Sequence, residues 1–111
     1  MSFAVRRDPK GVVVVTVDGQ LIVGNRHELK QKITEALEAG ERKFLVDFTK
    51  TGYIDSSGLG VLVSLSRRIR EADGELRLAG LNEDLRTLFE LTKLDTLFNI
   101  ADTATAALAG F

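Results

Sequence analysis

Residues 43–72 have the sequence KFLVDFTKTGYIDSSGLGVLVSLSRRIREA, which contains the clearest structural signal in the chain. The segment opens on a short apolar run at residues 43–48, which is typical of a strand. A polar loop is expected at residues 49–53. In residues 61–72 the apolar side chains recur at the spacing of a helix that packs one face against a core. A strand followed by a helix is the unit from which parallel sheets are built.

Strands and helices alternate on both sides of this segment. Two strands at residues 3–7 and 12–17 are separated by a turn that contains Pro9 and Gly11, so they are expected to pair as an antiparallel hairpin. The other expected elements are a helix at residues 26–39, a strand at 76–79, a helix capped by Asn82 that runs to Leu91, a short strand within 94–100 and a helix at 103–108. We therefore expect a single α/β domain over residues 1–111, with a mixed, mostly parallel β-sheet, an N-terminal hairpin and about four helices.

The strand at residues 12–17 and the helix at residues 26–39 have distinct burial patterns. The strand is β-branched throughout, and such a continuous apolar run indicates burial on both faces of the sheet. In the helix, the apolar residues Leu29, Ile33, Ala36 and Leu37 recur at helical spacing between charged or polar residues, so one side is expected to pack inward and the other to meet water. Asn25 is the candidate N-cap of this helix, and Gly40 stands where a C-terminal cap belongs.

The composition excludes several classes of protein. Lys and Arg number 15 against 16 Asp and Glu, and the net charge of −1 gives no reason to expect a nucleic acid or an anionic membrane as partner. The chain has no cysteine, which excludes disulfides and zinc ribbons. Its apolar runs are shorter than a membrane helix, and its first residues do not form a signal peptide. We expect a cytoplasmic protein without membrane insertion.

Residues 55–60, which join the strand to the helix, have the sequence DSSGLG. A serine at a helix start can cap a free backbone N–H, and a helix N-terminus favours an added anion. Glycines remove side chains, which lets a partner's backbone or a phosphate come close, although each costs about 0.5–1 kcal/mol relative to alanine. The alternative is purely structural, with one serine acting only as an N-cap and the glycines only relieving crowding.

This hexapeptide resembles the D-S-x-G-L-G signature of bacterial STAS-domain anti-anti-sigma factors. The resemblance extends over nearly the whole chain. Residues 12–17 followed by Gly19 are similar to the second strand of that family, and residues 29–33 are similar to its first helix. Residues 44–48 resemble the strand before the signature, and residues 85–94 resemble a late helix with the turn after it.

The resemblance implies a function and assigns residues to it. The phosphorylated residue is the serine directly after the aspartate, which is Ser56 here, with Ser57 as the second choice. The unphosphorylated form is expected to bind an anti-sigma factor, usually also a serine protein kinase, and so to release the sigma factor. Phosphorylation abolishes this binding, and a phosphatase restores it. The residues expected at the partner surface are Asp55, Ser56, Ser57, Gly58, Leu59, Gly60 and Val61.

Charge explains how such a switch can act without unfolding the domain. A phosphate adds about −1.5 to −2 charge at neutral pH, and on Ser56 it would lie beside Asp55. The helix dipole offsets part of the repulsion inside the domain, whereas a partner that fits a neutral hydroxyl meets a concentrated anionic spot. An interface penalty of about 1.4 kcal/mol already weakens binding tenfold.

The start of the helix is expected to contribute an apolar contact as well. Leu59 and Val61 are followed by Leu62 and Val63, and such a dense apolar run is not expected to face the core entirely. We therefore expect either Leu59 or Val61 to be exposed and to contact the partner.

One departure from the family pattern leaves a second function open. Many members carry an aspartate shortly after the glycine of the second strand, whereas Ile22 stands at that place here. The change puts the usual kinase contact in doubt. The alternative is a constitutive STAS scaffold without a phospho-switch, for instance an accessory subunit of a signalling complex or of a lipid transporter.

The sequence carries no recognisable enzyme motif. His27 is the only histidine, and it is expected on the helix surface rather than beside a nucleophile, as a Ser-His-acid triad requires. Neither a G-x-S-x-G elbow nor a phosphate-binding loop is present. We therefore expect no catalytic residue, metal or cofactor, and a monomer or weak dimer. A serine hydrolase that uses Ser56 is the third class considered.

Overall fold

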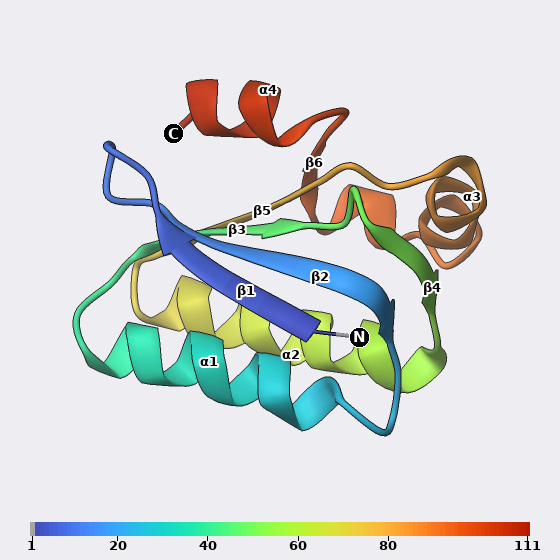
Figure 1. The fold of residues 1–111 in the computed structure, drawn as a ribbon, viewed down its shortest axis with the longest axis horizontal. Helices are drawn as coiled ribbons and strands as arrows, with labels where there is room; N and C mark the ends of the chain where they lie inside the picture. The colour runs from blue at the N-terminus through green and yellow to red at the C-terminus, as the bar shows by residue number, and fades with distance from the viewer. Residues whose placement is uncertain (1) are drawn as a thin grey trace.

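The computed structural model describes residues 2–111 and shows one mixed β-sheet with helices on both faces (Figure 1). Within these residues the strands are β1 (Ser2–Arg7), β2 (Val13–Leu21), β3 (Lys43–Asp47), β4 (Thr51–Ile54), β5 (Glu75–Ala79) and β6 (Asn99–Ala101). The helices are α1 (Arg26–Glu38), α2 (Ser56–Glu71), α3 (Glu83–Leu91) and α4 (Ala104–Ala109), with a short 3-10 helix, η1, at Leu94–Thr96.

The strands follow the order β1-β2-β3-β5-β6, and β4 pairs with the end of β2. The pair of β1 and β2 is antiparallel, and the other pairs are parallel. Parallel neighbours need a long crossover between them, and the helical segments supply it. The predicted α/β class, with a mixed and mostly parallel sheet and an N-terminal hairpin, is confirmed.

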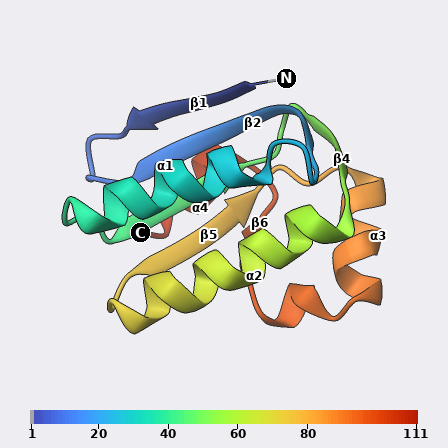
Figure 2. The same cartoon turned by 90° about the horizontal axis from the view of Figure 1, so that it is seen from below.

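The helices form two unequal layers on the sheet. Helices α1 and α2 lie side by side across one face (Figure 2), and α4 lies on the opposite face (Figure 1). At residues 12–17, which cover the residue before β2 and the first part of β2, alternate valines pack toward the two layers. Val13, Val15 and Val17 belong to the larger core, whereas Val12 and Val14 pack in a smaller cluster with Ala107 of α4 and its neighbours. These valines are at most 2% exposed, which confirms the predicted burial on both faces.

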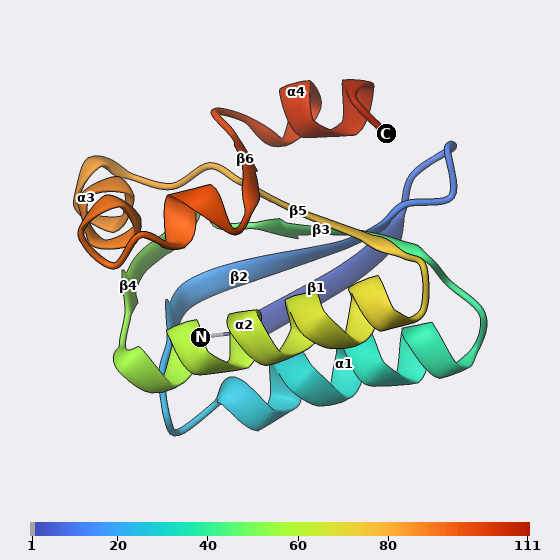
Figure 3. The same ribbon diagram turned by 180° about the vertical axis from the view of Figure 1, so that it is seen from behind.

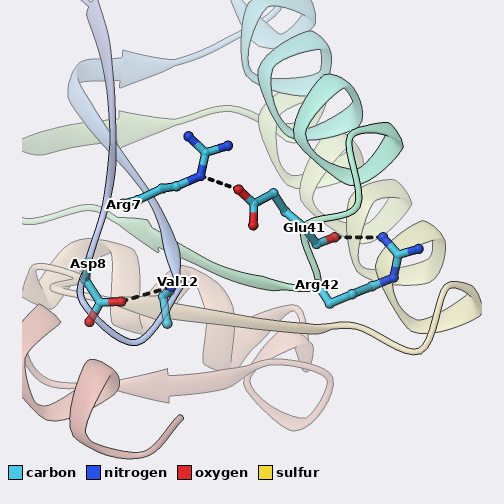
Figure 4. Close-up of polar contacts among 5 residues, drawn as sticks. All are labelled: Arg7, Asp8, Val12, Glu41 and Arg42. Carbon is cyan, nitrogen blue, oxygen red and sulfur yellow. Dashed lines mark hydrogen bonds and ion pairs between the residues drawn. The ribbon is translucent and has the colours of Figure 1, made fainter.

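An ion pair joins the N-terminal hairpin to the connection between α1 and β3, and each of the two segments has a hydrogen bond of its own (Figure 4). In the hairpin turn, the Asp8 carboxylate accepts a hydrogen bond from the N–H of Val12 at 2.9 Å. At the end of β1, Arg7 forms an ion pair with Glu41. The carbonyl of Glu41 in turn accepts a hydrogen bond from Arg42 at 2.8 Å. These contacts lie at the end of the molecule opposite to the start of α2 (Figure 1).

The expected strand at residues 12–17 extends to Leu21 as β2, and two predicted boundaries next to the hexapeptide at residues 55–60 are wrong. Residues 49–53 are expected as a loop, but residues from Thr51 onward form β4, which pairs with β2 across a register shift between Gly19 and Gln20. Such a short strand with a glycine inside it offers no period-two pattern to detect. Helix α2 begins at Ser56 instead of residue 61, because its cap lies earlier than the apolar periodicity indicates.

Candidate functional site

Asp55 is the residue that starts α2. Its backbone is extended, and its Oδ1 accepts a hydrogen bond from the N–H of Gly58 at 2.8 Å. This is the geometry of an N-cap aspartate, which satisfies one of the free donors of the first turn. The purely structural alternative, in which Ser56 or Ser57 is the N-cap, is therefore wrong. Both serines lie inside the helix, and neither is the N-cap.

The second carboxylate oxygen of Asp55 binds the loop between β2 and α1. Asp55 Oδ2 accepts a hydrogen bond from the N–H of Val23 at 3.1 Å, across 32 positions of sequence. The N–H of Asp55 donates to the carbonyl of Leu21 at 3.1 Å. One side chain and one peptide group therefore hold the start of α2 against the end of β2. The same loop is braced by Asn25, whose Oδ1 accepts from the N–H of Ile22 at 2.8 Å.

Ser56 and Ser57 differ in exposure. Ser56, the first residue of α2, is exposed, whereas Ser57 is half-buried. A modifying enzyme must reach the hydroxyl oxygen itself, so the exposed side chain is the better substrate of the two. Ser56, the residue that the family resemblance assigns to phosphorylation, is the more accessible of the two, and the assignment itself stays a prediction.

The two glycines of the segment have different surroundings. A Cβ built on Gly58 would lie 2.6 Å from the carbonyl oxygen of Leu21 and 2.9 Å from a side-chain carbon of Ile54. Gly58 is thus required by the close contact of α2 with β2 and β4. A Cβ built on Gly60 would meet no atom within 4 Å, and Gly60 is exposed. The expectation that Gly58 opens the surface to a partner is wrong, because Gly58 is buried, and for Gly60 it stays a prediction.

Leu59 and Val61 are both buried, with exposed fractions of 8% and 6%. The expectation that one of them is exposed is wrong. Both side chains belong to the main hydrophobic core, because α2 packs against the sheet on one side and also contacts α1 and β4. A helix with neighbours on several sides can bury more than one stripe of its surface.

An apolar groove lies beside Ser56, and no pattern in the sequence predicts it. It has a volume of about 510 Å³ and runs between the start of α2 and α3, which lie with β4 at one end of the molecule (Figure 3). Its polar lining includes Asp55, Ser56 and Asp84, and its other lining residues are Gly52, Tyr53, Ile54, Leu59, Leu85, Leu88 and Thr92. The exposed Tyr53, 57% accessible, stands at its side. The lining residues come from β4 and from α2 and α3 with their cap residues. The groove therefore exists only in the folded chain, and no single sequence segment contains it.

The first residues after β2 add a second apolar element near the site. Val23 is 60% exposed, although its N–H is tied to Asp55, and Ile22 before it is half-buried. This loop therefore presents an apolar surface next to the start of α2.

Comparison with known proteins agrees with this fold. The model of the STAS domain family matches residues 4–107. The chain belongs to the STAS domain family. Within this STAS domain the D-S-x-G-L-G segment forms the start of α2, where Asp55 is the cap and Ser56 is exposed.

Several relatives of this STAS domain are named anti-sigma factor antagonists. An anti-sigma-B factor antagonist from Staphylococcus aureus is 33% identical over 86 residues, which cover 78% of this chain and 80% of that protein. A solved structure from Thermotoga maritima, described as a candidate anti-sigma factor antagonist, is 28% identical, has a TM-score of 0.90 and matches 97% of this chain and 92% of its own. The phosphorylated form of SpoIIAA, a Bacillus cell fate determinant, is 22% identical with a TM-score of 0.77, covers 97% of each chain, and shares the fold.

The single histidine of the sequence does not line the apolar groove. His27 is exposed on α1, as expected. Between residues 2 and 111 no three His, Cys, Asp or Glu side chains stand close enough together to hold a metal ion. In the same part of the chain, no helix has both the length and the apolar character needed to cross a membrane.

Proposed function

We propose that this STAS domain is an anti-sigma factor antagonist whose binding to its anti-sigma factor is switched by phosphorylation of Ser56. The observation that carries the proposal is the position of Ser56. Its exposed side chain stands at the first residue of α2, directly after the fixed carboxylate of Asp55 and on the edge of the apolar groove. The names of the relatives support the class of function.

The apolar groove supports a protein partner. Interfaces commonly bury an apolar centre within a polar rim, and this groove combines Leu59, Leu85 and Leu88 with the carboxylates of Asp55 and Asp84. An anti-sigma factor that inserts an apolar side chain here would cover the Ser56 hydroxyl. Binding and phosphorylation would then use the same surface, so a phosphate on Ser56 would prevent the partner from binding.

In the phosphorylation step, ATP donates its γ-phosphoryl group to Ser56. The Ser56 hydroxyl oxygen forms a bond to the γ-phosphorus, the bond to the β-phosphate oxygen breaks, ADP leaves, and the hydroxyl proton passes to a base of the kinase. The product carries about −1.5 to −2 added charge beside Asp55. The positive end of the helix dipole at the first turn of α2 offsets part of the cost of this anion, whereas a docked partner must desolvate it. Release of the partner therefore needs no unfolding of the domain.

The test uses the serine-kinase anti-sigma factors encoded in the same genome. With kinase and ATP, intact mass is expected to rise by one phosphate, and calorimetry is expected to show loss of binding. Ser56→Ala should stay unmodified and still bind, and Ser56→Asp should bind poorly. Ser57→Ala is the matched control and should still accept the phosphate. Equal affinity before and after modification would contradict the proposal.

A second candidate is the constitutive scaffold, which the loop at Ile22 and Val23 favours. This loop presents an apolar surface instead of an acid next to Ser56. A scaffold would bind its partner equally well as wild type, Ser56→Ala and Ser56→Asp, so the same titrations separate the two functions.

A further inference from the structure

Gly60 occupies an exposed position inside α2 that gives no structural reason for a glycine. Nothing lies within 4 Å of a Cβ built there. Its neighbour in the motif, Gly58, is the opposite case, because a Cβ there would collide with the carbonyl of Leu21 at 2.6 Å. The fold therefore needs the glycine at 58 and does not need the one at 60.

Helix propensity also disfavours this glycine. Gly60 lies in the fifth position of a helix that runs from Ser56 to Glu71, where alanine is intrinsically more favourable than glycine. Packing does not require Gly60 and local stability opposes it, so its advantage must lie in something that approaches the surface of α2 from outside.

The geometry of a helix indicates what a side chain at this position would cover. Ser56 and Gly60 are four residues apart and therefore lie on the same face, one turn above the other. Side chains on a helix lean toward its N-terminus, so a residue covers the surface of the turn before its own Cα. A side chain at position 60 would lean over the turn that begins with Ser56.

We infer that Gly60 keeps the Ser56 hydroxyl open to the active site of the serine kinase that modifies it, and that a side chain at position 60 blocks this access. The inference rests on the proposed phosphorylation of Ser56. A transferring phosphoryl group must come within about 3–3.5 Å of the attacking oxygen, so the protein that carries it must press closely on the surface around Ser56. Tyr53 and Asp55 lie before Ser56 in the chain, on the side of the groove, and Gly60 leaves the side along α2 uncovered.

The experiment compares Gly60→Ala and Gly60→Leu with wild type, using the anti-sigma factor kinase that phosphorylates the wild-type chain. The kcat/KM for phosphorylation of Ser56 is expected to fall about tenfold or more in Gly60→Leu, and less in Gly60→Ala. The thermal midpoint of Gly60→Ala is expected to rise by about 4 °C, since alanine is the better helix former. A purely structural glycine would show the opposite change in stability.

Glu71→Leu is the control for adding an exposed leucine to the same helix. It lies at the last residue of α2, about 16 Å along the axis from Gly60, and should leave kcat/KM unchanged. Phosphorylation of Gly60→Leu at the wild-type rate, or a lower thermal midpoint for Gly60→Ala, would overturn the inference. A wild-type chain that no kinase modifies would instead refute the proposed function, and this inference with it.

Discussion

The carboxylate of Asp55 joins Val23 to the start of α2, with Oδ2 accepting from the N–H of Val23 at 3.1 Å while Oδ1 caps Gly58 at 2.8 Å. The loop after β2 and the first turn of α2 therefore share one anionic anchor. Because Ser56 is the next residue in the chain, its position depends on this anchor.

Removal of the Asp55 carboxylate should loosen both segments. We expect Asp55→Ala to lower the free energy of unfolding by about 1–2 kcal/mol, since a cap and a second hydrogen bond are lost. Urea denaturation measures the loss, and hydrogen exchange should show a faster Val23 amide. Asp55→Asn keeps one acceptor oxygen and should fall between wild type and Asp55→Ala. An unchanged Val23 exchange rate in Asp55→Ala would show that the loop is held by other contacts.

A methyl group at Gly58 should destabilise the fold. The Cβ of Gly58→Ala would stand 2.6 Å from the backbone oxygen of Leu21, which cannot move without disturbing β2. Overpacking of this kind costs about 1–3 kcal/mol, measured as a lower urea midpoint. Gly60→Ala, two residues along the same helix, is the matched control and should be at least as stable as wild type. Equal stability of the two variants would mean that α2 can shift away from β2.

Leu59 and Val61 should behave as core residues. We expect Leu59→Ala and Val61→Ala each to lower the free energy of unfolding by about 2 kcal/mol, because both side chains are less than 10% exposed. Val23→Ala, which changes a side chain that is 60% exposed, should change stability by less than about 0.5 kcal/mol. A stable Leu59→Ala protein would restore the earlier expectation of an exposed apolar residue.

The apolar groove should be required for partner binding more than for folding. We expect Tyr53→Ala and Leu88→Ala each to weaken binding of the anti-sigma factor about tenfold or more, as loss of an interface anchor does. Isothermal titration calorimetry measures the affinity, and thermal unfolding checks the fold. Leu91→Ala is the control on α3, because Leu91 is 78% exposed and does not line the groove. If Leu91→Ala weakened binding as much as Leu88→Ala, the partner would contact the outer face of α3 instead.

Much of the architecture is visible in local sequence patterns. The valine run of residues 12–17 predicted a strand buried on both faces, and the element order predicted a mixed, mostly parallel sheet; both are confirmed. Asn82 was predicted as the cap of a helix ending at Leu91, and its side chain accepts a hydrogen bond from the N–H of Leu85 at 2.8 Å. These signals are readable because periodicity, capping and turn chemistry depend on neighbours within a few residues.

The details of the site depend on contacts between segments that are distant in sequence. Pairing with β2 makes β4 a strand, and the carbonyl of Leu21 makes Gly58 indispensable where Gly60 is not. Leu59 is buried because helix α2 packs beside β4 and the core, and the groove beside Ser56 needs residues from both α2 and α3. Composition and periodicity describe which residues prefer to be inside, whereas burial and accessibility at each position follow from which neighbours the folded chain brings there.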